Sequence, residues 1–404
     1  MNETNQAILL LTVRFGASKT DNVAPLGPAE YGRLAAWLHT NDHEPRDLLR
    51  HPEKALADWS DPKRRITKER IRLLLNRGMA MGVALEKWLG AGLWVITRAD
   101  SDYPERLVKQ LGQDRPPVLF GAGNKNLLNA GGLAMVGSRD ITEADQAYTA
   151  MIAKQAASEG MNIVSGGARG VDETAMKSAL EVEGTALGIL SKGLLSAALS
   201  AKWRTHMKNR QLCLVSSFSP DAGWNTGNAM GRNKYIYCLS DYAVVVQSTK
   251  GSGGTWAGAT ENLRNHWTNL FVRSEKQSDG LKALIGLGAL PLSLPPESTR
   301  SGEWLRALLT ANQATIEGLH AEDTEANATR KFYEQFKTEL QERFAQQATV
   351  SLSELKVQMP DLKQGQIMDW LDSAEEAGFI RRKKPKKREY ELVQESNSSQ
   401  MTLF

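Results

Sequence analysis

The chain has 404 residues, of which 41% are hydrophobic and 24% charged, and its formal net charge is +4. This composition is ordinary for a globular protein with a buried core, and the length predicts two or three domains. No apolar run reaches the roughly 18 residues that a membrane span needs, and the first residues lack the basic start and cleavage site of a secretory signal. We therefore expect a cytoplasmic protein with no membrane partner.

The two cysteines and six histidines give no sign of a metal centre. Cys213 and Cys238 both lie in apolar surroundings, which predicts buried free thiols rather than a disulfide. No histidine stands at metal-ligand spacing from either cysteine. The sequence therefore predicts no metal site and no cofactor.

Residues 1–128 predict a small helical domain that ends in a link to the next domain. Apolar residues recur at three- and four-residue spacing over Ala29–His39, Ile66–Arg77 and Met79–Leu89. A short strand at Leu93–Thr97 and one more helix are predicted to follow.

Residues 129–298 alternate short apolar runs with helical stretches. The runs are LAMVG, NIVS, ALGIL, LCLVSS, YAVVVQ and LFVR. Such runs are typical of strands in a parallel sheet that is covered on both faces. Right-handed crossovers bring the strand-to-helix loops of such a sheet to one edge, where a ligand should bind. The predicted fold class is therefore α/β, a Rossmann-like, doubly wound and mostly parallel sheet.

Residues 299–345 are interpreted as a linker with a helix, and residues 346–396 as a winged helix with a basic wing. Ser351 and Glu354 fit a capping box at the start of a short helix. The run Arg381–Arg388, RRKKPKKR, has seven positive charges, so the rest of the chain is net acidic. This local basic character indicates one surface that meets a polyanion. The predicted wing contacts are Lys383, Lys384, Lys386 and Lys387.

Four loops at the predicted ligand edge combine small residues with hydroxyl or cationic groups. They are GSRD after the first strand, SGGARGVD after the second, MGRNKY at the start of a helix, and STKGSGGTW after YAVVVQ. Glycine-rich backbone and guanidinium groups can hold phosphate oxygens. Each loop alone also fits an ordinary tight turn, or an arginine paired with a carboxylate such as Asp140 or Asp172. Their convergence on one edge favours a phosphate-rich ligand.

The chain resembles the DNA-processing protein A family, also called Smf, in four consecutive segments: AMVGSRDIT, NIVSGGARGVDETAMKSALEVEGTALGIL, GRNKYIYCLSDYAVVVQ and GSGGTWAGATENL. The resemblance implies a Rossmann-like domain that binds single-stranded DNA, forms a homodimer and helps to load a RecA-type recombinase during DNA uptake. The residues that match the family's binding segments are Ser138, Arg139, Gly166, Gly167, Arg169, Arg232, Asn233, Lys234, Gly251, Ser252, Gly253 and Thr255.

Two positions depart from the pattern of the family. Phe218 stands where a glutamate is usual, and Gln247 stands where an acidic residue is common. A component of a system for defence against phage is therefore an alternative biological setting. A protein that senses a small nucleotide is an alternative function, although a mononucleotide would not need the basic wing.

An enzyme is a further alternative, because the fold resembles the nucleotide phosphoribohydrolases of the LOG type. Their glycine-rich loop has a glutamate three residues after its threonine, whereas the nearest glutamate after Thr255 is Glu261. A helix puts these two positions on different faces, so a hydrolytic group would not reach the bond. Asp172 and Glu173 are conceivable substitutes. We nevertheless expect a protein without catalytic activity.

The sequence also offers aromatic residues for base stacking and a basic wing for duplex binding. Trp224, Trp256 and Tyr235 are near the loops and could stack on bases, although a core role fits Trp256 at least as well. The wing could hold a second stretch of backbone or a duplex.

Overall fold

The structure is a computed structural model of the whole chain. It describes residues 1–16, 23–223, 226–276, 278–311, 336–337, 340–345, 347, 349–358, 364–376, 379–384 and 389–392. The chain divides into two compact units, Met1–Gln313 and Ala314–Phe404.

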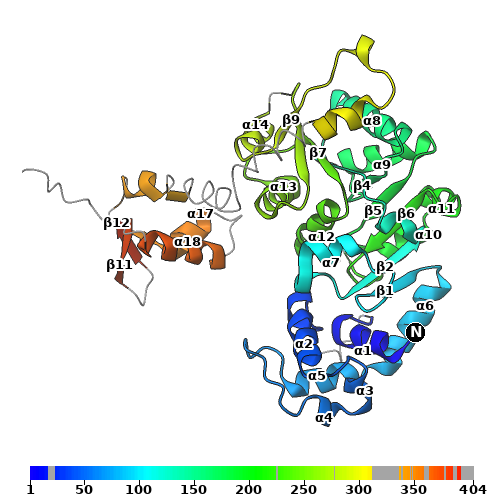
Figure 1. Cartoon of the computed structure of the whole chain (residues 1–404), viewed down its shortest axis with the longest axis vertical. Helices are drawn as coiled ribbons and strands as arrows, with labels where there is room; N and C mark the ends of the chain where they lie inside the picture. The colour runs from blue at the N-terminus through cyan, green and yellow to red at the C-terminus, as the bar shows by residue number, and fades with distance from the viewer. Residues whose placement is uncertain are drawn as a thin grey trace, which may run out of the picture. The chain divides into compact units, whose positions relative to one another are not determined.

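Helices fill the amino-terminal region, as predicted (Figure 1). They are α1 (Glu3–Thr12), α2 (Pro28–Thr40), α3 (Asp47–Arg50), α4 (Pro52–Ala55), α5 (Lys68–Leu75) and α6 (Gly78–Gly90). The helices expected from apolar spacing correspond to α2, α5 and α6. The sequence did not reveal α1, because its apolar residues form the continuous run AILLL instead of a stripe, and all five are buried.

One sheet of nine strands crosses the first unit, in the order β1-β2-β6-β5-β4-β3-β7-β8-β9. The strands are β1 (Trp94–Thr97), β2 (Val118–Gly123), β3 (Leu133–Gly137), β4 (Ile163–Ser165), β5 (Ala186–Ile189), β6 (Leu212–Ser216), β7 (Tyr242–Gln247), β8 (Asn269–Arg273) and β9 (Leu290–Leu292). From β6 to β9 all pairs are parallel, whereas β1 and β2 add to the sheet as antiparallel strands. The mostly parallel α/β sheet is thus confirmed.

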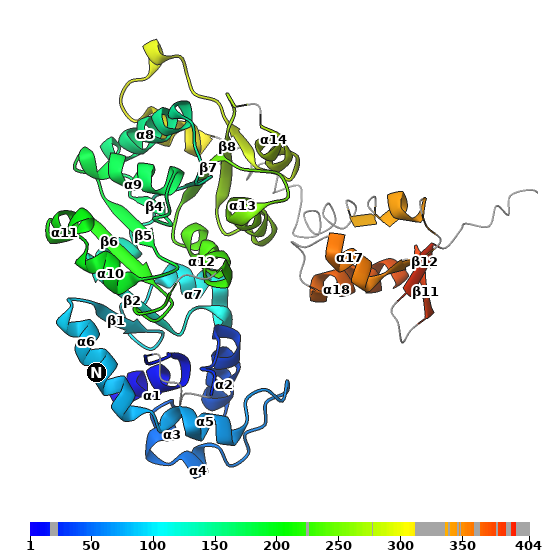
Figure 2. The same cartoon turned by 180° about the vertical axis from the view of Figure 1, so that it is seen from behind.

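Helices cover both faces of the sheet, as the views from the front and from behind agree (Figures 1 and 2). They are α7 (Glu105–Leu111), α8 (Glu143–Ser158), α9 (Val171–Glu181), α10 (Leu194–Leu199), α11 (Ala201–Lys208), α12 (Thr226–Cys238), α13 (Gly253–Asn265) and α14 (Asp279–Gly286). Alternate residues of β3 face opposite cores: Leu133 and Met135 pack with α8 and α9, whereas Ala134 and Val136 pack with α12 and α13. These two cores explain why the strands are apolar throughout.

The topology switches direction at β3. From β3 the chain builds β4, β5 and β6 on one side, and then returns to place β7, β8 and β9 on the other. In open α/β sheets, ligands bind outside the carboxyl ends of the strands at such a switch point. The loops after β3 and β7 therefore lie at the position where a ligand is expected.

Among its described residues, the second unit contains the helices α17 and α18, a helical stretch over residues 340–344, and a three-stranded antiparallel sheet in the order β10-β12-β11. Its elements are β10 (Val350–Ser351), α17 (Leu352–Gln358), α18 (Gln364–Glu376), β11 (Ile380–Lys384) and β12 (Glu389–Leu392). The predicted capping box is present, because the Ser351 N–H donates to Glu354 at 2.8 Å and the Glu354 N–H donates to the Ser351 hydroxyl at 3.3 Å. This arrangement agrees with the predicted winged helix.

Candidate nucleic-acid interface

Hydrogen bonds hold together the loops that follow β3, β4 and β7. The Ser138 N–H donates to the Gln247 carbonyl at 3.1 Å, and the Val171 N–H donates to the Ser138 carbonyl at 3.3 Å. The Thr255 hydroxyl donates to the Gly137 carbonyl at 2.9 Å. The structure therefore brings together three loops that are far apart in the sequence. The Thr255 hydroxyl is one of the groups that join them.

A buried pair of opposite charges lies under the second loop. Asp172 accepts a hydrogen bond from the Gly166 N–H at 3.1 Å, and Arg232 donates to the Ile189 carbonyl. Burial raises the pKa of Asp172 to about 6, although the nearby Arg232 acts to lower it. Burial lowers the pKa of Arg232, whereas the nearby Asp172 acts to raise it. The two groups form the floor of the site.

The position of Arg232 differs from the expectation that it starts a helix. It lies inside α12, which already includes Thr226, and only 6% of its surface is exposed. Its Nε is buried and has no hydrogen-bond partner among the residues that the structure describes. Asn233 donates to the Gly254 carbonyl at 2.9 Å and so joins α12 to the start of α13, whereas Lys234 is half-buried over the ring of Tyr235.

The rim of the site has two exposed arginines, Arg139 and Arg169. Arg169 forms an ion pair of 2.5 Å with Asp140, and both side chains are exposed, so the carboxylate partner considered from the sequence is present. Gly170 has a φ of +91°, and a Cβ there would lie 2.4 Å from the Ser138 carbonyl oxygen. Glycine is therefore required where these two loops touch. A cavity of about 510 Å³ lies beside Arg139 and Arg169.

The loop after β7 exposes a stretch of glycine-rich backbone. Gly251, Ser252 and Gly253 are all exposed, and the two glycines have φ angles of +68° and +83°. Ser252 occupies the N-cap position of α13, but its side chain makes no capping hydrogen bond. Free N–H groups at a helix start are suited to an anion.

The aromatic residues considered for base stacking are mostly inside the protein. Trp256 and Tyr235 are only 7% and 5% exposed, which gives both a core role, and Trp224 lies outside the described residues. Sequence reasoning treated Phe218 only as a departure from a pattern. It is half-buried and lines a second cavity, of about 770 Å³, next to the loop after β6.

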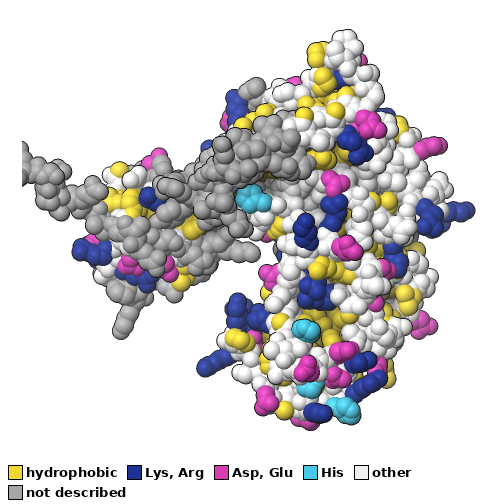
Figure 3. All heavy atoms as spheres, viewed as in Figure 1, with side chains coloured by type: hydrophobic (Ala, Val, Ile, Leu, Met, Phe, Trp, Pro, Cys, Tyr) yellow, Lys and Arg dark blue, Asp and Glu magenta, His cyan; other side chains and the backbone are white. Residues whose placement is uncertain are grey.

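The basic wing is described only in part. Lys383 in β11 lies 3.4 Å from Glu391, and Lys384 ends the same strand. Lys386 and Lys387 lie outside the described residues. Over the face seen in Figure 3, Lys and Arg side chains alternate with Asp and Glu, so this face is not uniformly basic.

Both cysteines are free and buried, as predicted. Among the described residues, no group of three His, Cys, Asp or Glu side chains gathers as a metal site requires. In the same part of the chain, no helix has both the length and the apolar character needed to cross a bilayer.

The fold and the site define a Rossmann-like α/β protein with a glycine- and arginine-rich ligand edge at its switch point. The family model described as DNA recombination-mediator protein A matches residues 94–296, half of the chain. The chain belongs to this family.

Similarity to individual relatives covers part of each protein. The chain is 31% identical to protein Smf of Escherichia coli (strain K12) over 215 residues, which are 52% of this chain and 57% of the relative. It is 28% identical to DNA processing protein DprA of Bacillus subtilis (strain 168) over 143 residues, 35% of this chain and 48% of the relative. The chain thus spans about half the length of these relatives.

A solved structure shows the same fold. DNA processing protein A from Streptococcus pneumoniae superimposes with a TM-score of 0.54 at 20% identity, over 72% of this chain and 95% of that one. At this identity the comparison concerns the fold alone.

Proposed function

We propose that the protein binds single-stranded DNA at the carboxyl edge of its sheet and acts in DNA processing or recombination. The observation that carries this proposal is the junction of three loops, which places exposed arginines and glycine-rich backbone around one point. Family membership supports a role on DNA. Phosphate contacts of this kind give affinity that depends steeply on salt.

The predicted residues have two kinds of role in this proposal. Phosphate oxygens are held by side chains and N–H groups of the rim, together with Lys234. These residues are Ser138, Arg139, Gly167, Arg169, Lys234, Gly251, Ser252 and Gly253. Gly166 is buried and its N–H already donates to Asp172, so it shapes the site instead of contacting phosphate. Arg232, Asn233 and Thr255 position the loops, because their polar atoms bond to main-chain carbonyls.

The carboxylates considered for catalysis are engaged in other interactions, which supports a binding protein rather than an enzyme. Asp172 is buried against Gly166 and Arg232. Glu173 forms ion pairs with Lys177 at 2.6 Å and with Lys202 at 2.8 Å. A general acid or base must reach the bond that it cleaves, and neither carboxylate is free to do so.

Two separate domains contact DNA in this proposal. The domain of residues 129–298 holds the single strand, and the winged helix of residues 346–396 contacts duplex DNA through Lys383, Lys384, Lys386 and Lys387. The protein acts as a homodimer and delivers the strand to a RecA-type recombinase.

Fluorescence anisotropy of labelled oligo-dT, measured over a range of salt, tests the proposal. Duplex DNA and a mononucleotide serve as competitors. Salt-dependent binding that the mononucleotide does not displace is expected. Weak strand binding, combined with capture or breakdown of the mononucleotide, would replace DNA binding by nucleotide sensing or hydrolysis.

A further inference from the structure

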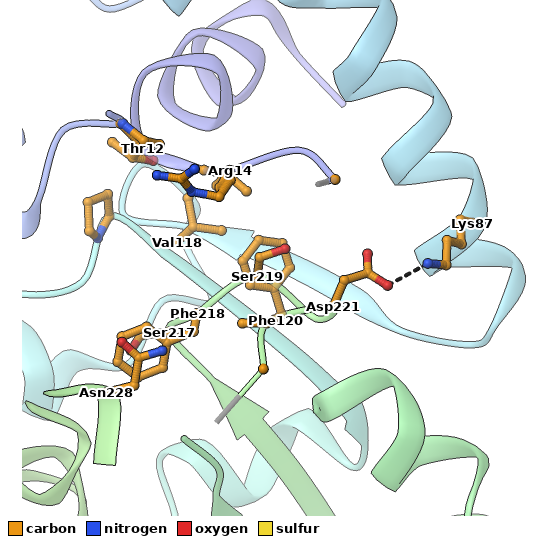
Figure 4. Close-up of a pocket in the computed structure, with 16 residues that line it drawn as sticks. Thr12, Arg14, Lys87, Val118, Phe120, Ser217, Phe218, Ser219, Asp221 and Asn228 are labelled. Carbon is orange, nitrogen blue, oxygen red and sulfur yellow. Dashed lines mark hydrogen bonds and ion pairs between the residues drawn. The ribbon is translucent and has the colours of Figure 1, made fainter. Parts of the chain in front are cut away.

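A cavity of about 770 Å³ lies at the same edge of the sheet, beside the carboxyl end of β6 (Figure 4). Its lining comes from the end of α1 and the segment after it, from α6, from the start of β2, from the loop between β6 and α12, and from α12 itself. None of the loop residues proposed above is part of that lining. The cavity is therefore a second site, of a volume usual for small-molecule pockets.

The charged groups in the lining leave a positive balance. Asp221 is the carboxylate of the lining, and it pairs with Lys87 at 2.5 Å and accepts a hydrogen bond from the Trp88 indole at 2.7 Å. Arg14 also lines the cavity and is exposed. Within the described residues no carboxylate pairs with Arg14. Its guanidinium group is thus available for an anion.

The rest of the lining suits a flat, partly apolar group. Phe218 is half-buried, and its neighbours Phe120 and Val118 are buried, so one wall is apolar and aromatic. Ser217 and Ser219 also line the cavity with their hydroxyl-bearing side chains (Figure 4). An aromatic wall with hydroxyls nearby is suited to a nucleobase, which stacks on the ring and hydrogen-bonds through its edge.

The cavity and the loop site share helix α12. Asn228 lines the cavity, and Arg232 lies under the second loop, four residues further along the same helix. Residues at this spacing share a helix face and are about 6 Å apart along the axis. The cavity and the loop site therefore adjoin the same short stretch of α12.

We propose that this cavity binds one nucleotide unit, with its base against Phe218 and its phosphate against Arg14. The same chemistry fits a nucleotide of the strand held by the loops and a free mononucleotide. Binding of a nucleotide that belongs to the strand rests on the proposed function. The experiment below distinguishes it from binding of a free mononucleotide.

The test compares four full-length proteins: wild type, Arg14→Gln, Phe218→Leu and the control Arg64→Gln. Arg64 is an exposed arginine of the amino-terminal region that does not line the cavity. Binding of labelled oligo-dT is measured by anisotropy over a range of salt, and binding of thymidine monophosphate is measured by calorimetry. Thermal unfolding confirms that each variant is folded.

Loss of one phosphate contact in Arg14→Gln should reduce the salt slope of strand binding by about 0.7. Loss of the aromatic face in Phe218→Leu should weaken binding about tenfold. The control should match wild type. If the cavity takes free nucleotide instead, wild type binds thymidine monophosphate and both cavity variants lose that binding.

The inference is overturned if both cavity variants bind oligo-dT and thymidine monophosphate as wild type does. In that case strand binding that still depends on Arg169 would leave the proposed function intact. If wild type binds no strand, the proposed function fails, and the monophosphate measurement alone decides the role of the cavity: binding that needs Arg14 supports it, and no binding overturns it.

Discussion

Asp172 and Arg232 both approach the point where Gly166 lacks a side chain, beneath the second loop. A Cβ added to Gly166 would lie 1.9 Å from Arg232 Nη1 and 2.5 Å from Asp172 Oδ2. Both charged residues are buried. The absent side chain of this glycine is therefore what allows a guanidinium and a carboxylate to lie under the second loop.

Gly166→Ala should destabilise the protein and weaken strand binding. The added methyl group must displace a buried charge from its partners, and overpacking of this kind costs about 1–3 kcal/mol. Urea denaturation measures the free energy of unfolding, and anisotropy measures binding.

Gly231→Ala is the matched control for this substitution. Gly231 lies in α12 next to Arg232, and a Cβ there would meet nothing within 4 Å. Alanine is the better helix residue, so the control should raise the free energy of unfolding by about 0.5–1 kcal/mol. Equal stability of the two alanine variants would contradict the close approach above Gly166.

The stability of the fold should depend on pH through Asp172. Its pKa rises from 3.8 in the unfolded chain to about 6 in the folded one, so the folded state binds the proton more tightly. The resulting stabilisation is complete below the lower pKa and is lost as the pH rises through the higher one.

Relative to Asp172→Asn, wild type should therefore lose about 2 kcal/mol of unfolding free energy between about pH 4 and pH 7. Urea denaturation of both proteins at the two pH values gives this difference. The asparagine side chain keeps an oxygen that can accept a hydrogen bond from the Gly166 N–H, but it does not ionise. A constant difference between the two proteins would mean that the carboxyl group titrates with an ordinary pKa.

The Thr255 hydroxyl should stabilise both the fold and the site. Thr255→Val keeps the shape of the side chain but removes the donor to the Gly137 carbonyl, at a cost of about 1 kcal/mol. Strand binding should weaken too, because this bond joins the loop after β7 to the end of β3. Thr255→Ser keeps the donor and should restore both properties; failure of serine to do so would make the methyl group, rather than the hydroxyl, responsible.

The wing should contribute phosphate contacts to duplex binding. The double variant Lys383→Gln, Lys384→Gln removes two positive charges from β11 and keeps long polar side chains at both positions. The salt slope for duplex binding should fall by about 1.8, while oligo-dT binding by the loops changes little. Lys356→Gln in α17 is a control in the same unit, and an unaltered duplex slope in the double variant would show that these lysines touch no phosphate.

The sequence predicted the parts of the structure that local pattern determines. Continuous apolar runs identified the parallel strands, and Ser351 with Glu354 identified a helix start, because these features depend on near neighbours. The place of β2 was not predicted: its antiparallel pairing with β6 joins Phe120 to Ser216, 96 positions later in the chain. Only the assembled sheet shows that β1 and β2 extend it.

In the candidate site too, the residue types were predicted from local sequence, whereas their roles depend on the assembled fold. Glycine and arginine types indicated an anion-binding edge, and the topology brings the loops after β3, β4 and β7 together as expected. The roles within the site depended on burial, which composition does not reveal. Arg232 was predicted at a helix start but lies inside α12. Arg14 was not predicted as a site residue, because Phe120 and Phe218, which line the same cavity, lie more than 100 positions later in the chain.

Arg169 gives the most direct test of the loop site. Its ion pair with Asp140 joins two exposed side chains, and such pairs contribute only about 0–1 kcal/mol to stability. A phosphate group can therefore replace the carboxylate at little cost. Arg169→Ala should leave thermal unfolding nearly unchanged but weaken oligo-dT binding by about 1–3 kcal/mol, as expected for a charge-assisted hydrogen bond.

Asp140→Asn provides the opposite change at the same ion pair. It removes the carboxylate that competes with phosphate for Arg169, so oligo-dT should bind more tightly than to wild type. The double variant should bind like Arg169→Ala, because the gain from Asp140→Asn requires the arginine. If Asp140→Asn strengthens binding equally with and without Arg169, then Asp140 acts by general repulsion of the strand and Arg169 is no phosphate ligand.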